Sequence, residues 1–160
     1  MATGLKLKIT NTANSTTVER TSDREIVVTR WFDAPARLVF EAWSNAELFQ
    51  RWWVPRSMGM TLHGCEMDVR TGGTYRLDFG GGMVFFGKYT EVTPPSRIVW
   101  TNEEGDGSVT TVTFEEVDGR TLLVMTELFP SKEALDAEGG AADAAHETFD
   151  QLEELLATLG

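Results

Sequence analysis

The sequence predicts an α+β fold in which a curved antiparallel β-sheet wraps around one long C-terminal helix, with two short helices after the first strand. Residues 130–159 end in an amphipathic helix, in which Phe149, Leu152, Leu156 and Leu159 share one face. Ala142 and Ala145 continue this face upstream, and the polar side chains lie mostly on the other side: Glu147, Asp150, Gln151, Glu153 and Glu154. The middle of the chain is a series of strand-like segments joined by short turns, which favours antiparallel neighbours. The apolar stripe of the helix must be buried, and the sheet is the surface available to bury it.

The N-terminal part of the chain has little to bury. Residues 1–15 are rich in threonine, asparagine and lysine, so we expect a flexible tail, and alternation in Leu5–Ile9 leaves open a short edge strand or a contact with another chain. Residues 16–160 are expected to form a single domain, because their number is typical of one domain. Thr16–Arg20 is a candidate edge strand, and the β-branched and aromatic residues of Glu25–Phe32 predict the first clear strand.

Two short helices are predicted after this strand. Asp33 is suited to cap the first of them, and Pro35 to stand in its first turn, where the proline ring fits a helical backbone. The pair Ser44-Asn45 then interrupts that helix and caps a second one, Ala46–Trp52. The second helix is expected to end before Pro55, because the residue before a proline avoids the helical conformation.

Six more strands are predicted between the short helices and the last helix. They are Thr61–Asp68, Thr74–Phe79, Met83–Val92, Arg97–Asn102, Val109–Glu116 and Arg120–Leu128. Glycine clusters, a Pro-Pro pair and Asp-Gly turns separate them, and such connections are typical of antiparallel hairpins. Alternation places one set of side chains on the concave face under the helix and the other set in solvent. The solvent set contains Arg76, Asp78, Lys88, Thr111 and Glu115.

Composition and charge narrow the classes of function. The 160 residues include 25 acidic and 14 basic side chains, and the formal net charge of −11 argues against non-specific binding to nucleic acid or to an anionic membrane surface. The single cysteine excludes an internal disulfide framework and suits a reducing compartment. No apolar run reaches the ~18 residues of a membrane span, and Met1–Asn14 lacks the apolar core of a signal peptide. We therefore expect a soluble, cytoplasmic protein with no nucleic-acid or membrane partner.

Several short motifs occur in order along most of the chain. They are Phe32–Pro35, Val39–Trp43, Arg51–Trp53, Cys65–Gly73, Gly87–Pro95 and Thr148–Leu152. Together they resemble the START-like, or SRPBCC, helix-grip superfamily, and more closely the family named for the activator of the heat-shock-protein-ninety ATPase. The resemblance runs from about Arg24 to the end, and it implies the fold predicted above with a cavity between sheet and helix, but no shared catalytic set. Relatives often carry Gly followed by Trp or Met where this chain has Ala144–Ala145, so the resemblance implies that a bulky cavity wall is missing here.

These features favour a binding module that holds a small, mostly apolar or aromatic molecule, without catalytic residues, metal or cofactor. The inward phase of the strands is rich in methionine and aromatic residues, and the helix opposite offers small alanines. The predicted lining residues are Trp53, His63, Cys65, Met67, Tyr75, Leu77, Phe85, Tyr89, Trp100, Phe114, Met125, Ala145, Phe149 and Leu152. Two alternatives stay open: a co-chaperone-like domain acting on a heat-shock chaperone ATPase, by family analogy alone, or a cyclase- or hydrolase-like enzyme using an inward Glu or His. A homodimer also stays open.

Few residues are candidates for catalysis or metal binding. Glu91 and Glu127 are in the inward phase of their strands, where a desolvated carboxyl could transfer protons, but both stand near strand ends, where glutamate usually reaches solvent. His63, Cys65 and His146 are zinc-ligating types, but their spacing matches no zinc motif. The sequence contains no Gly-x-Ser-x-Gly segment, phosphate loop or dinucleotide fingerprint.

Overall fold

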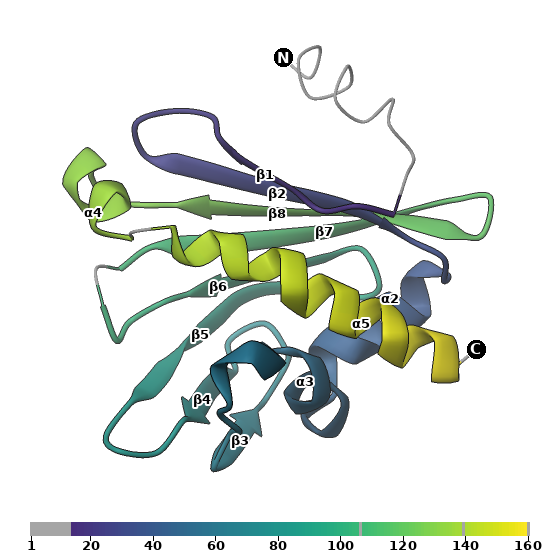
Figure 1. The fold of residues 1–160 in the computed structure, drawn as a ribbon, viewed down its shortest axis with the longest axis horizontal. Coiled ribbons are helices and arrows are strands. Elements are labelled where there is room, and N and C mark those ends of the chain that lie inside the picture. The colour runs from purple at the N-terminus through teal and green to yellow at the C-terminus, as the bar shows by residue number, and fades with distance from the viewer. Residues whose placement is uncertain (1–13, 106, 139, 160) are drawn as a thin grey trace.

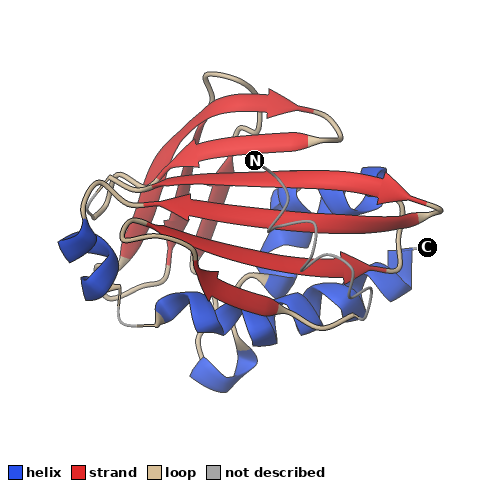
Figure 2. Ribbon diagram, turned by 90° about the horizontal axis from the view of Figure 1, so that it is seen from above, coloured by secondary structure: helices blue, strands red, loops and turns tan. Residues whose placement is uncertain are grey.

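An eight-stranded antiparallel sheet curves around the long C-terminal helix α5 (Ala145–Leu159), which lies across the concave face (Figures 1 and 2). The structure is a computed structural model that describes residues 14–105, 107–138 and 140–159. The predicted α+β helix-grip fold is confirmed. Of the flexible tail predicted at residues 1–15, residues 1–13 lie outside the described residues, and so does the short strand predicted at Leu5–Ile9.

Every strand pairs with antiparallel neighbours, in the order β1-β2-β8-β7-β6-β5-β4-β3. The strands are β1 (Thr17–Arg20), β2 (Glu25–Phe32), β3 (Gly64–Met67), β4 (Thr74–Asp78), β5 (Val84–Thr93), β6 (Arg97–Thr101), β7 (Val109–Val117) and β8 (Arg120–Leu128). The predicted segments are confirmed to within one or two residues, except that β3 is shorter at its start than the predicted strand at Thr61–Asp68. β2 pairs with β8, so Glu25 lies opposite Leu128 and the N-terminal strands join the sheet beside its last strand.

Apart from α5, the helices are short. They are α2 (Ala36–Ser44), α3 (Ala46–Trp52), α4 (Lys132–Ala137) and the 3-10 helices η1 (Arg56–Met58) and η2 (Ala141–Ala144). The sequence pattern predicts α2, α3 and α5, whereas η1, α4 and η2 contain too few residues to display a helical period. Ala142, predicted to continue the face of the last helix, lies instead in η2.

The two short helices differ in how they begin. Asp33 does not cap α2, because its carboxylate accepts a hydrogen bond from Arg120 on β8 (2.9 Å), and Glu116 of β7 accepts one from the backbone N–H of Ala36 (2.9 Å). A carboxylate from a distant strand therefore satisfies a group that a local cap usually satisfies. Asn45 caps α3 as predicted, by accepting hydrogen bonds from two backbone N–H groups of the first turn (2.9 and 3.3 Å).

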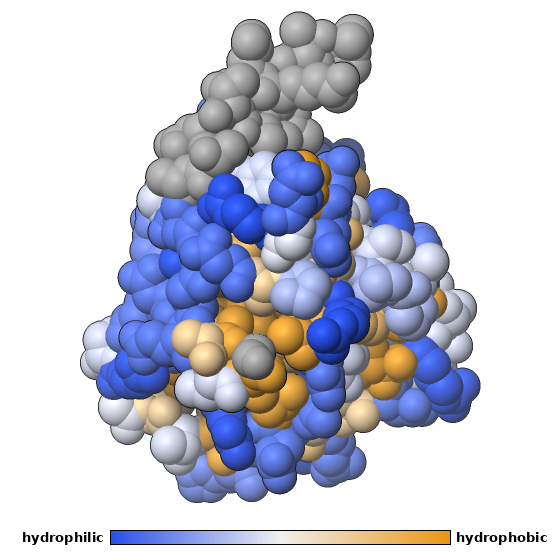
Figure 3. Space-filling view, turned by 90° about the vertical axis from the view of Figure 1, so that its right-hand side faces the viewer, coloured by the Kyte–Doolittle hydropathy of each residue, from blue (hydrophilic) through white to orange (hydrophobic). Residues whose placement is uncertain are grey.

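The core lies between the sheet and the helices and is rich in aromatic rings. Phe149, Leu152 and Leu156 on α5 are at most 2% exposed, and burial stabilises the fold by about 1.5–3 kcal/mol for each such side chain. Trp43 and Trp52 pack edge to face with centroids 4.8 Å apart, and the indole N–H of Trp52 donates to a backbone carbonyl of α2 (2.9 Å). Where α5 ends, hydrophobic side chains reach the surface inside a hydrophilic rim (Figure 3).

The position of Gln151 differs from the predicted division of α5 into an apolar and a polar face. It was expected on the polar side, but it is 4% exposed and contacts the segment that follows α3. Its Nε2 donates to the carbonyl oxygens of Trp52 (3.1 Å) and Val54 (2.9 Å), and its Oε1 accepts from the backbone N–H of Arg56 (2.9 Å). One side chain thereby satisfies three backbone groups at the end of α3 and in the segment after it, far away in sequence.

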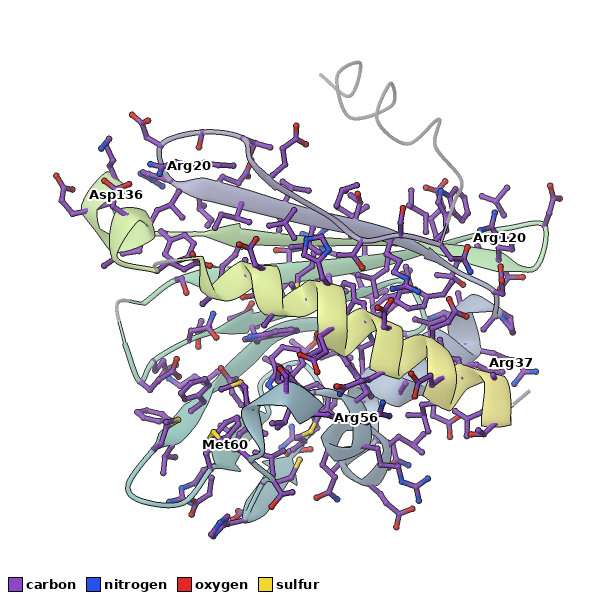
Figure 4. The ribbon with its side chains drawn as sticks, in the orientation of Figure 1. Arg20, Arg37, Arg56, Met60, Arg120 and Asp136 are labelled. Carbon is purple, nitrogen blue, oxygen red and sulfur yellow. The ribbon has the colours of Figure 1, made fainter. Side chains whose placement is uncertain are left out.

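Ion pairs join other elements to the sheet. The buried guanidinium of Arg30 on β2 pairs with Asp150 (2.5 Å) and Glu153 (3.5 Å) of α5. Arg20 of β1 pairs with Asp136 of α4 (2.8 Å), and both side chains are visible at one corner of the molecule (Figure 4). The second pair is more than two-fifths exposed, so its net contribution to stability is below about 1 kcal/mol.

Candidate ligand-binding groove

A groove of about 390 Å³ lies between the N-terminal half of α5, the segment after α3 and the strands β5 to β8. Most of its lining is methionine, aromatic or alanine. The residues that line it are Trp53, Val54, Pro55, Met58, Met60, Phe79, Met83, Phe85, Trp100, Asn102, Glu104, Ser108, Thr110, Met125, Glu127, Glu138, Ala141, Ala142, Ala144, Ala145, Thr148 and Phe149. Met60, below α5 in Figure 4, is on the wall that the segment after α3 supplies.

A smaller recess of about 40 Å³ adjoins the groove, with which it shares Trp53, Phe85, Trp100 and Asn102. Its other lining residues are Trp43, Phe49, Met67, Tyr75, Leu77, Tyr89 and Ile98. The recess is nearly all apolar, and strands β3 to β6 and helices α2 and α3 supply its walls.

Aromatic contacts hold the walls of the recess in place. The ring of Trp53 stacks on Phe49 with centroids 4.7 Å apart, and Tyr75 packs against Tyr89 at 5.6 Å. Burial raises the pKa of both tyrosine hydroxyls well above the usual value, so both remain protonated at physiological pH. The hydroxyl of Tyr75 donates to the backbone carbonyl of Thr101 (2.8 Å).

Polar side chains gather at one end of the groove because the sheet register aligns them. Trp100 lies opposite Thr110, and Thr110 lies opposite Glu127, across β6, β7 and β8. The amide of Asn102 donates to the hydroxyls of Thr110 (3.0 Å) and Ser108 (3.2 Å), and its oxygen accepts from the Trp100 indole (3.2 Å). The hydroxyl of Ser108 donates to Glu127 (3.4 Å), so this end of the groove is a connected polar network.

The comparisons with known proteins agree with this architecture. The family model described as Activator of Hsp90 ATPase homolog 1-like protein matches residues 33–157. The chain belongs to this family. No curated protein sequence is significantly similar to the chain.

Solved structures share the fold of this family member. A Rhodobacter sphaeroides protein has a TM-score of 0.79 at 23% identity, over 91% of this chain and 99% of that one. A Staphylococcus epidermidis protein has a TM-score of 0.68 at 27% identity, over 90% and 95% of the two chains. A Plasmodium falciparum protein described as an HSP90 activator has a TM-score of 0.61 at 24% identity, over 84% and 96%.

In this family member, most of the predicted lining residues come together around the groove and the recess. They are Trp53, Met67, Tyr75, Leu77, Phe85, Tyr89, Trp100, Met125, Ala145 and Phe149. The other four line neither space: His63 is exposed, Cys65 is half-buried beside Met67, and Phe114 and Leu152 are buried in the core. Alternation gives the correct sheet face for Phe114, but a residue can face inward and still lie behind other side chains.

The sequence pattern does not predict the polar end of the groove or the wall that the segment after α3 supplies. The polar end comes from residues that flank a turn with the pattern of an ordinary hairpin connection: Asn102, Ser108 and Thr110. The wall after α3 contains Met58 and Met60, which follow a proline that predicts only the end of a helix. The sequence gives one indication of the wall after α3: this segment contains large apolar residues, which are uncommon in a loop that is surrounded by solvent.

The titratable candidates are scattered in the described part of the chain. Glu91 is away from the groove and pairs with Arg97 (3.0 Å), whereas Glu127 lines the groove at its polar end. His63 and His146 are both exposed. Within residues 14–105, 107–138 and 140–159, no three side chains of the metal-binding types come together. None of the described helices is long and apolar enough to cross a membrane.

Proposed function

We propose that this chain is a binding module that holds a small, mostly apolar or aromatic molecule between the sheet and α5. The observation that carries the proposal is the groove, whose volume of about 390 Å³ is in the range of small-molecule sites. Its walls are mainly methionine, aromatic and alanine side chains, and a connected network of polar side chains lies at one end, as in sites that bury a ligand and fix its orientation. The proposal assigns no catalytic residues.

Mass spectrometry of freshly purified protein tests for an occupant. Under native conditions we expect an added non-covalent mass, which disappears under denaturing conditions and identifies the ligand class. A bare mass in both conditions leaves the protein without a co-purified ligand and moves the question to added probes.

A neutral fluorescent probe, N-phenyl-1-naphthylamine, tests the groove directly. Ala144 is exposed and lines the groove, whereas Ala157 is exposed on the last turn of α5 and does not line it. We expect Ala144→Trp to weaken probe binding about tenfold, because the indole occupies ligand space, and Ala157→Trp to leave binding unchanged. Equal probe affinity in both variants, with both folded, would rule out binding in this groove.

A second candidate is a co-chaperone-like role, which would also imply a cytoplasmic location and a part in the stress response. It is supported by the family description, by the Plasmodium falciparum relative and by the exposed side chains of Met58, Met83 and Phe86, which suit a protein contact. The test is the ATPase rate of an Hsp90-class chaperone from the same organism, with and without this protein. An accelerated rate that is lost in Phe86→Ser favours this role, and an unchanged rate excludes it.

A further inference from the structure

One side chain that lines the recess carries a buried hydrogen-bond donor without an acceptor. Among the described residues, three buried side-chain atoms lack a hydrogen-bond partner: Nε of Arg30 and Nε1 of Trp31 and Trp43. Of these residues, Trp43 alone lines the recess. The other two tryptophans of the core behave differently, because the indoles of Trp52 and Trp100 donate to acceptors at 2.9 and 3.2 Å. Trp43 is 2% exposed, so bulk water does not satisfy its N–H, and such a group calls for an explanation.

The hydroxyl of Tyr89 is a second donor in the same recess. Tyr75 donates to a backbone carbonyl, whereas the Tyr89 hydroxyl has no hydrogen bond to any described residue. The Tyr89 side chain is 5% exposed, and its raised pKa keeps the proton on the oxygen. The side chains that line the recess therefore include two donors without an acceptor, one indole and one phenol, and apart from Asn102 and the hydroxyl of Tyr75, which have partners, the rest of the wall is mostly apolar.

Size and charge limit what those donors can meet. The recess of about 40 Å³ has room for one substituent or a water, while the adjoining groove of about 390 Å³ has room for the body of a ligand. In the part of the chain that the structure describes, no lysine or arginine lines either space, and Glu104, Glu127 and Glu138 line the groove. An anionic group would be desolvated there without a cation to pair with it.

We propose that the ligand is an uncharged aromatic molecule with an acceptor oxygen, such as a ketone or quinone carbonyl, that enters the recess and accepts hydrogen bonds from Trp43 and Tyr89. The proposal rests on the proposed binding function and specifies its ligand class. The aromatic body lies in the groove against Trp53 and Trp100, and the oxygen points to the two donors. The tyrosine and tryptophan donors thereby set which aromatic molecules are preferred.

Two planar probes of nearly equal shape test the proposal: 9-fluorenone, which carries a carbonyl, and fluorene, which carries a methylene at that place. Their binding to the wild type, Tyr89→Phe and Trp43→Phe is measured by calorimetry, and thermal unfolding checks that each variant is folded. Tyr89→Phe removes a hydroxyl and keeps the ring, so we expect it to weaken fluorenone binding about fivefold and fluorene binding less than twofold. The infrared carbonyl band of bound fluorenone is expected at lower frequency than in hydrocarbon solvent, and closer to the solvent value in each variant.

The outcomes separate this proposal from the function on which it rests. If both probes bind, but the variant affects them equally and the carbonyl band is unshifted, the donors do not meet the ligand and the proposal is wrong, while groove binding stands. The N–H of Trp43 would then rest on the face of a neighbouring ring or on a water. If fluorenone does not bind but N-phenyl-1-naphthylamine does, the ligand class is wrong. If no probe binds, the groove function itself fails. Trp43→Phe also empties core space, so Tyr89→Phe decides the result if the tryptophan variant does not fold.

Discussion

Replacement of Gln151 by leucine should destabilise the protein by about 3 kcal/mol, far more than its position on the predicted polar face of α5 implies. The amide makes three hydrogen bonds to the backbone of Trp52, Val54 and Arg56, and leucine of similar volume makes none. Each buried carbonyl left unpaired costs about 1–3 kcal/mol, and the N–H of the exposed Arg56 costs less because water can reach it. About 3 kcal/mol corresponds to a fall in Tm of roughly 10 °C for a chain of this size.

Urea unfolding followed by tryptophan fluorescence measures this loss, and the slope m should stay constant if the native surface is unchanged. Glu154→Gln is the matched control on the same helix, because the Arg56–Glu154 pair (2.9 Å) is more than three-fifths exposed on both sides and should contribute below about 1 kcal/mol. Equal losses for the control and for Gln151→Leu would refute the anchoring role of Gln151. The segment that Gln151 anchors is also a wall of the groove, so N-phenyl-1-naphthylamine should bind more weakly to the leucine variant.

Three further outcomes are expected. Gly87→Ala should cost about 3 kcal/mol or more by urea unfolding, because a Cβ there would lie 1.9 Å from the carbonyl oxygen of Thr101 in the neighbouring strand; a loss below 1 kcal/mol would contradict this contact. Arg30→Met should change the free energy of unfolding by less than about 1 kcal/mol, because it removes a desolvated charge and leaves the carboxylates of Asp150 and Glu153 partly in water. A loss of several kcal/mol would show instead that the ion pairs of Arg30 stabilise the fold. Hydrogen bonds from Ser57 lower the pKa of the Glu147 carboxyl in the folded protein. The stability that these hydrogen bonds contribute is therefore fully present above the unfolded pKa near 4.5, and it is lost as the pH falls through the lower folded pKa. The amide resonance of Ser57 in NMR should follow this titration, and a midpoint at or above 4.5 would refute the prediction.

The sequence predicts the elements whose stability is local in origin. β2 and α3 begin and end where the pattern predicts, because β-branched residues, a capping Asn45 and a following Pro55 act within a few residues of the elements they define. The sheet order follows from hairpin turns for β3 to β8. The pairing of β2 with β8, by contrast, joins segments far apart in the sequence, and no local pattern predicts it.

The features that the sequence does not predict arise from contacts between distant segments. Glu116 replaces Asp33 at the start of α2, and Gln151 is buried by a loop that precedes it by almost a hundred residues. For the site, alternation finds the aromatic walls, but it cannot tell a lining side chain from one behind it, as Leu152 illustrates. Polar residues such as Asn102 look like ordinary turn residues until the sheet register brings them to the groove.

The position of β2 beside β8 has a consequence for how the chain folds during synthesis. β1 and β2 leave the ribosome before the other strands, but β8, which pairs with β2 on its other side, and α5, whose Phe149 packs against Phe32, are made only after β3 to β7. Until then the apolar face of β2 has no partner, so the nascent chain carries an unpaired strand edge that can aggregate. Contacts of such long sequence separation also form slowly. We therefore expect the sheet to close around α5 only once β8 and α5 have left the ribosome, and fragments that end before β8 to depend on ribosome-associated chaperones for their solubility.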